Sequence, residues 1–126
     1  MGLAARGIVG DRAEQKALRF LIRQGLKPVT RNFRSRGGEI DLIMLHGNCL
    51  TFVEVRYRNS SRFSTPALTV DRHKQRKILR TAALFLARKP QFARLASRFD
   101  VVSITGGEDG TIEWLQDAFR PFDSTL

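Results

Sequence analysis

The sequence predicts an α/β sandwich formed by one domain that spans residues 1–126. Two segments repeat apolar residues with the 3.6-residue period of a helix, and five shorter segments have the composition of strands. A Gly-Asn pair between two of the strand-like segments predicts a tight hairpin. The predicted order is helix, three strands, helix, strand, strand. A meander of three strands with one helix before it and one after it is expected to form a sheet covered by helices.

Apolar stripes and helix-ending residues mark the two predicted helices. The first covers Val9–Gln24, and Gly25 and Pro28 follow as its expected end. Its expected core-facing residues are Ala17, Leu18, Leu21 and Ile22. The second covers Val70–Arg88 and ends before Pro90. Its expected core-facing residues are Ile78, Ala82, Phe85 and Leu86.

The predicted strands surround the hairpin and follow the second helix. They are Val29–Ser35, Glu39–His46, Cys49–Arg58, Phe99–Thr105 and Thr111–Leu115. Side chains alternate between the two faces of a strand, so Asp41 and Ile43 are expected on one face and Ile40 and Leu42 on the other. Both faces then carry apolar residues, which predicts that this strand is covered on both sides.

The hairpin places charged residues opposite one another. With Gly47-Asn48 as the turn, Asp41 lies opposite Glu54 and Glu39 lies opposite Arg56. Two opposed carboxylates in a covered sheet repel each other, so they need either a shared proton or a cation between them. A divalent cation such as Mg²⁺ or Mn²⁺ suits oxygen ligands of this kind. The alternative is a solvated sheet edge at which Arg56 pairs with Glu39.

Two further charged side chains fall on apolar helix stripes. Glu14 lies one turn before Leu18, and a carboxylate on a core-facing stripe needs a partner. The alternative is a helix-capping carboxylate. Lys74 lies one turn before Ile78, where it points toward the core or extends its ammonium to solvent.

The charge balance predicts a polyanionic partner. Lys and Arg total 22 against 12 Asp and Glu, a formal net charge of +10. Nucleic acid is the usual partner of so basic a domain, although an arginine-rich proteome also explains the excess. The candidate nucleic-acid-binding residues are Arg58, Arg62, Lys74, Arg76, Lys77 and Arg80.

Composition also excludes several classes. Cys49 is the only cysteine, which rules out an internal disulfide and a thiolate zinc cluster. No apolar run reaches the ~18 residues of a membrane span, and the N-terminal segment lacks the apolar core of a signal peptide. We therefore expect a cytoplasmic protein without a membrane partner.

Five segments resemble, in order, the signature blocks of the YraN-type bacterial family: AEQKALRFL, RNFRSRGGEIDLI, FVEVRYR, HKQRKI and RFDVV. That family looks like a member of the PD-(D/E)XK superfamily. The resemblance implies a restriction-endonuclease-like core, in which a helix, a three-strand meander, a second helix and one or more strands form a mixed sheet flanked by helices. Archaeal Holliday junction resolvases have a similar core and act as dimers, so the resemblance allows a homodimer but leaves the oligomeric state open.

The resemblance also implies a metal-dependent phosphodiesterase. Its metal ligands fall on Glu14, Asp41 and Glu54, with Mg²⁺ or Mn²⁺ as the cofactor, and its catalytic residues fall on Asp41, Glu54 and Arg56. The family motif has a lysine where this chain has Arg56, and Lys74 matches a basic position of the second helix. Arginine keeps the charge, but its planar fork is bulkier than an ammonium group.

These observations lead to one expected function and two alternatives. We expect a nucleic-acid-binding endonuclease that hydrolyses phosphodiester bonds, with DNA rather than RNA as substrate. The first alternative is a catalytically impaired nucleic-acid-binding domain, because Arg56 replaces the motif lysine. The second is a protein-interaction module whose basic surface meets an acidic protein.

Overall fold

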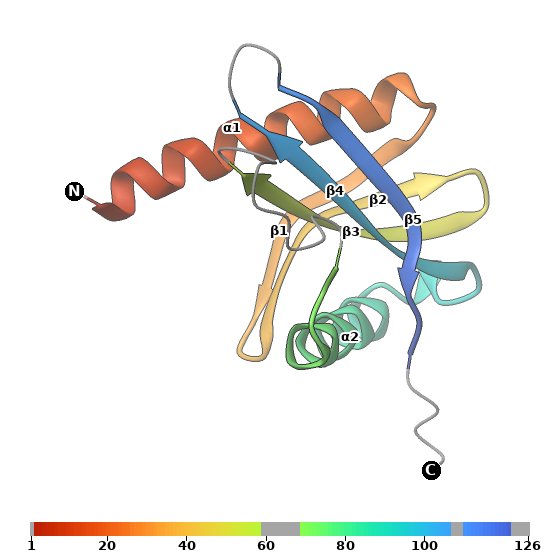
Figure 1. Cartoon of the computed structure of the whole chain (residues 1–126). Coiled ribbons are helices and arrows are strands. Elements are labelled where there is room, and N and C mark those ends of the chain that lie inside the picture. The colour runs from red at the N-terminus through yellow and green to blue at the C-terminus, as the bar shows by residue number, and fades with distance from the viewer. Residues whose placement is uncertain (1, 59–68, 107–109, 122–126) are drawn as a thin grey trace.

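A computed structural model describes residues 2–58, 69–106 and 110–121 of the chain (Figure 1). It contains two long helices and five strands. In chain order they are α1 (Gly2–Arg23), β1 (Lys27–Ser35), β2 (Gly38–His46), β3 (Cys49–Arg58), α2 (Arg72–Arg88), β4 (Ala96–Thr105) and β5 (Ile112–Phe119). A short 3-10 helix, Pro90–Phe92, follows α2. Within this described part of the chain, no helix is both long enough and apolar enough to cross a bilayer.

The strands form one mixed sheet in the order β1-β2-β3-β4-β5. Neighbours are antiparallel except β3 and β4, which run parallel. Parallel neighbours need a crossover, and α2 lies on the segment that connects them. The predicted α/β class and the predicted order of elements are confirmed.

Each face of the sheet carries one helix and one apolar core. On the α1 face, Ala13, Ala17 and Leu21 pack with residues of β2, β3 and β4. On the α2 face, Phe85 packs with sheet residues including Phe52 and with the aromatic ring of Phe33, whose centroid lies 5.2 Å away. The expectation that β2 is covered on both faces is confirmed, since Leu42 on the α1 face and Ile43 on the α2 face are fully buried.

Both helices end within one residue of the predicted position, but α1 begins at Gly2 rather than at Val9. Gly25 has φ +96°, and Leu26 N–H donates to the Leu21 carbonyl, so the chain turns back and buries Leu26. Leu26 belongs to the apolar core on the α1 face, whereas Ile22, which was expected to face the core, is 45% exposed. The second helix starts two residues later than predicted, because Asp71 caps it by accepting a bond from Lys74 N–H.

Four strands are longer than predicted, β1 and β2 by one or two residues at their starts and β4 and β5 by three residues each. β4 begins at Ala96 rather than Phe99, and β5 continues to Phe119 rather than ending at Leu115. The buried carboxylate of Asp100 extends this pairing, because it accepts bonds from Arg98 Nε, Trp114 Nε1 and the Asp117 backbone N–H, each 2.9 Å long. The sequence did not predict these hydrogen bonds, because Asp100 is a single carboxylate in an apolar strand and its partner Trp114 is distant in sequence.

Regular alternation fails in the middle of β1 and β2. Ile40 packs on the α2 face together with Ile43, although alternation predicts opposite faces for these two residues. Its neighbour across the sheet is Phe33, whose ring contacts Phe85 of α2. The break coincides with Asn32 of β1, which has φ +51° and lies across from Asp41. The irregularity therefore falls at the predicted site.

Candidate functional site

The two central strands separate at Asp41. The predicted hairpin register holds from His46–Cys49 to Leu42–Val53, and no backbone pairing is recorded beyond it. The expected backbone pairing of Asp41 with Glu54 is therefore wrong. Instead, the Val55 backbone N–H donates a 2.7 Å hydrogen bond to Asp41 Oδ2. A carboxylate oxygen thus takes the place of a ladder carbonyl at the point where β2 and β3 diverge (Figure 1).

The side chains of Asp41 and Glu54 nevertheless meet in one cavity. This cavity has a volume of about 210 Å³ and lies between the sheet and α2. Its remaining lining comes from Gly38, Glu39, Lys74, Lys77 and Ile78. The sequence prediction that Asp41, Glu54 and Lys74 lie together is confirmed.

A glycine allows β2 to approach α2 beside this cavity. A Cβ atom at Gly38 would lie 3.2 Å from Thr81 Oγ1 and 3.3 Å from Lys77 Cβ, closer than ordinary contacts. Gly38 also has φ +156°, which side chains disfavour. The start of β2 can therefore rest directly on the helix that supplies Lys74.

The environment of Asp41 favours its protonated form. Burial, followed by the neighbouring charge of Glu54 and a hydrogen bond with it, raises the pKa of Asp41 to about 8. The Val55 N–H acts in the opposite direction because it stabilises the carboxylate. Asp41 is therefore an acid that a bound cation would deprotonate near neutral pH.

Glu54 forms an ion pair with Lys74, which α2 supplies to the cavity. Glu54 is 6% exposed, and its Oε2 contacts the ammonium of Lys74, whose side chain is 48% exposed. Within the described residues, no other group donates a hydrogen bond to this oxygen. Because Lys74 lies in the first turn of α2, the Asp71 cap that fixes this turn also fixes the position of the ammonium.

Glu14 lies near enough to Asp41 for its charge to help raise the Asp41 pKa, but it does not line the cavity. Its side chain is 13% exposed, and the nearest cation is Arg31, with Nη2 4.0 Å from Glu14 Oε1. Burial and the nearby Glu39 raise the pKa of Glu14. Within the described residues, no three Asp, Glu, His or Cys side chains gather closely enough to hold a metal. The structure thus brings together two of the three predicted ligands.

Arg56 does not line the cavity. It is half-buried on β3, and it forms no hydrogen bond or ion pair within the described part of the chain. The alternative pairing of Glu39 with Arg56 is wrong, because Glu39 Oε1 pairs with Arg34 Nε at 3.4 Å. The separation of β2 and β3 explains this outcome, since Glu39 no longer lies opposite Arg56.

The predicted nucleic-acid-binding residues lie mostly on α2. Lys74 and Lys77 line the cavity, whereas Arg76 and Arg80 are exposed on the same helix. Arg58 ends β3 and is half-buried. Arg62 lies outside the described residues.

The raised pKa of Asp41 predicts an unusual pH dependence of stability. Between pH ~4 and ~8 the folded chain holds a proton that the unfolded chain has released, so stability falls as pH rises through this window. One proton corresponds to a slope of at most about 1.4 kcal/mol per pH unit. Asp41→Asn should remove this slope in EDTA, whereas Glu113→Gln on exposed β5 should retain it. Urea unfolding from pH 5 to 8 measures both, and equal slopes for Asp41→Asn and the native chain would contradict the assignment.

Comparison with known proteins identifies the family. The model of the family described as "Uncharacterised protein family UPF0102" matches residues 13–104, which include Asp41, Glu54 and Lys74. The chain is 46% identical over 117 residues to a UPF0102 protein of Saccharophagus degradans, covering 93% of this chain and 97% of the relative. It is 48% identical over 119 residues to one of Enterobacter sp. (strain 638), covering 94% and 88%.

A third relative is named YraN, the protein type that the sequence segments resemble. The UPF0102 protein YraN of Escherichia coli O139:H28 is 50% identical over 112 residues, covering 88% of this chain and 83% of the relative. The expected likeness to YraN-type proteins is therefore confirmed. The chain belongs to the uncharacterised protein family UPF0102.

Proposed function

We propose that this protein is a metal-dependent phosphodiesterase that cleaves nucleic acid, with DNA as its main substrate. The observation that carries the proposal is the pair formed by half-buried Asp41 and buried Glu54, which shares a cavity with Lys74. Two like charges in a covered sheet are costly, and such arrangements concentrate at functional sites. A purely structural role would be served better by apolar residues of similar volume.

The topology supports a restriction-endonuclease-like core. A helix leads into an antiparallel meander, a crossover helix follows, and the next strand adds in parallel to the last strand of the meander. In this proposal the substrate approaches the acidic pair from the end of the sheet at which β2 and β3 diverge.

The residues of the cavity fit a divalent cation. Mg²⁺ is often held by one or two carboxylates, and water and substrate phosphates complete its coordination. Asp41 and Glu54 supply two carboxylates, and Glu54 Oε2 already contacts a positive charge, the ammonium of Lys74. When bound, Mg²⁺ or Mn²⁺ would supply the Lewis acidity that polarises the phosphate and lowers the pKa of water. Glu14 remains a candidate ligand only through a water molecule or a shift of α1.

The surrounding side chains have separate roles in this proposal. The Val55 N–H holds the Asp41 carboxylate in one orientation. With a cation held at Glu54, the Lys74 ammonium would be available to neutralise a phosphate oxygen. Lys77, on the same cavity wall, contacts the neighbouring phosphate. Arg56 cannot accept a proton, so its role is limited to stabilising charge.

Two observations favour a second candidate, a nucleic-acid-binding domain with impaired catalysis. The ammonium of Lys74 already balances Glu54 without a metal, and Arg56 replaces the motif lysine. In that case the acidic pair has only a structural role, and the net charge of +10 carries the function.

One assay separates the two functions. Labelled duplex, single-stranded and branched DNA are incubated with the purified chain in Mn²⁺ and in EDTA. The proposal predicts cleavage in Mn²⁺ alone and binding in both. Binding should weaken with salt, with a slope of about −0.9 in log K per duplex phosphate contacted. Binding in both buffers without cleavage of any substrate would favour the second candidate, and the absence of both would refute the two together.

A further inference from the structure

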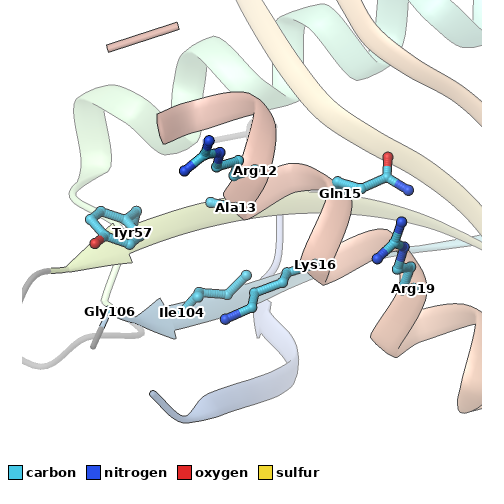
Figure 2. A pocket seen from close by; sticks show the side chains of 8 residues that line it. All are labelled: Arg12, Ala13, Gln15, Lys16, Arg19, Tyr57, Ile104 and Gly106. Atoms are coloured by element: carbon cyan, nitrogen blue, oxygen red, sulfur yellow. The ribbon is translucent and has the colours of Figure 1, made fainter. Parts of the chain in front are cut away.

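A second cavity lies on the opposite face of the sheet, outside the proposed catalytic site. Its volume is about 500 Å³, which is within the ordinary range for small-ligand pockets. Figure 2 shows α1 along one side and the ends of β3 and β4 along the other. Ala13 and Ile104, both buried, form its apolar part.

Three cations of α1 surround this cavity. Arg12, Lys16 and Arg19 are spaced by four and three residues, which places them on one side of the helix. In Figure 2 the side chain of Arg12 extends toward Tyr57, and that of Lys16 toward Ile104. All three are exposed, and none forms an ion pair or hydrogen bond within the described residues. Their charges are thus available to an anion.

An aromatic ring stands at the rim of the same cavity. Tyr57 is 43% exposed, which is unusual for so large a side chain in a strand. Its hydroxyl rests against Gly106, where an added Cβ would come within 2.1 Å of the oxygen. The Gly106 N–H in turn bonds to the Arg58 carbonyl at 2.6 Å, so the backbone that supports the ring is fixed to β3. The ring therefore presents a fixed, partly open face.

Cations beside an open aromatic ring are the combination that binds unpaired nucleotides. The backbone phosphates contact the cations, and a base stacks on the ring. A base within a duplex is already stacked on its neighbours and cannot do this. An acidic peptide would use the cations but would gain nothing from the ring.

We propose that the cavity lined by Arg12, Lys16, Arg19 and Tyr57 binds a phosphorylated nucleoside, supplied by an unpaired stretch of a nucleic-acid strand. Tyr57 stacks on the base, and Arg12 and Lys16 hold the adjoining phosphates. The inference extends the proposed nucleic-acid substrate to strands with unpaired segments. It requires only binding, so a test in EDTA is independent of cleavage at Asp41 and Glu54.

Fluorescence anisotropy with a labelled thymidine oligomer in EDTA tests the site. Tyr57→Ala should weaken binding about tenfold through loss of stacking, while Tyr57→Phe should bind within about twofold of the native chain. Lys16→Ala and Arg12→Ala should each reduce the salt slope by about 0.7, the value for one phosphate of a single strand. The matched control is Arg23→Ala, which removes the same charge from α1 outside the cavity. It should leave the slope unchanged.

Gly106→Ala gives a second test that keeps every binding group. The new methyl group would displace the Tyr57 ring, so binding should weaken while the salt slope stays unchanged. Thermal unfolding of each variant verifies its fold. An abasic phosphodiester oligomer that binds the native chain as tightly as the thymidine oligomer would overturn the proposal, as would native affinity in Tyr57→Ala. Equal weakening in Arg23→Ala and Lys16→Ala would also overturn it, because it would indicate charge alone.

A competition experiment distinguishes the two sources of the ligand, a nucleic-acid strand and a free nucleotide. Thymidine 5′-monophosphate should displace the oligomer only at concentrations far above the oligomer Kd, since it offers one phosphate and one base. Displacement at concentrations near that Kd would still identify a phosphorylated nucleoside as the ligand. It would, however, assign the cavity to free nucleotides and overturn the assignment to a strand.

Discussion

Asp41→Asn is expected to lower metal-dependent cleavage of DNA by more than about 100-fold. Loss of groups that merely support metal ligands already costs 10–100-fold, and Asp41 is proposed as a ligand itself. Asparagine keeps the size of the side chain and an oxygen that can accept the Val55 N–H, but it lacks the charge that holds the cation. Single-turnover cleavage in Mn²⁺ measures the loss.

The stability of Asp41→Asn serves as an internal control for its activity. Because the charged form of Asp41 is disfavoured in the metal-free protein, Asp41→Asn should be at least as stable as the native chain at pH 8 in EDTA. A loss of activity would then come from the site and not from unfolding. Cleavage within a few fold of the native rate would remove Asp41 from the catalytic residues.

Lys74→Met should lower the same rate by about 100-fold, the scale on which one preorganised donor acts in a catalytic site. Lys74 provides the ammonium that contacts Glu54, whereas Arg56 at the motif position lies outside the cavity. Arg56→Met should therefore change the rate by less than about fivefold. The same single-turnover assay compares the two variants at fixed DNA and Mn²⁺.

The control for Lys74→Met is Lys27→Met. Lys27 is exposed at the start of β1 and pairs with Leu45, at the end of β2 far from Asp41, so this change matches the loss of charge without touching the cavity. A large loss of cleavage rate in Arg56→Met with little loss in Lys74→Met would assign the charge-stabilising role to Arg56, at the motif position. A similar loss of cleavage rate in Lys74→Met, Arg56→Met and Lys27→Met would indicate that each lost charge only weakens DNA binding.

The sequence was sufficient to predict the elements that position the site. The Gly47-Asn48 turn fixed the register of the hairpin, and this register is observed as far as Leu42–Val53. The apolar residues around Asp41 and Glu54 predicted burial on both faces, because an open sheet edge would not carry them. The apolar stripe that begins at Ile78 placed Lys74, one turn earlier, on the side of α2 that faces the sheet.

The separation of β2 and β3 was beyond prediction from local pattern. Alternation assumes that a strand stays regular, and Asn32 with φ +51° violates that assumption across from Asp41. The exclusion of Arg56 from the cavity follows from this separation. The basic cavity of α1 was also missed, because Tyr57 and Lys16 are distant in sequence and meet only after the helix packs on the sheet.

Direct binding of Mn²⁺ tests the central claim, that Asp41 and Glu54 hold a divalent cation. Electron paramagnetic resonance can count bound Mn²⁺ in the native chain, in Asp41→Asn and in Glu54→Gln, each with and without duplex DNA. The account predicts one tightly bound ion per native chain, strengthened by DNA because phosphate oxygens join the coordination, and its loss in both variants. Retention of the same ion by both variants, or its absence from the native chain on DNA, would contradict the account.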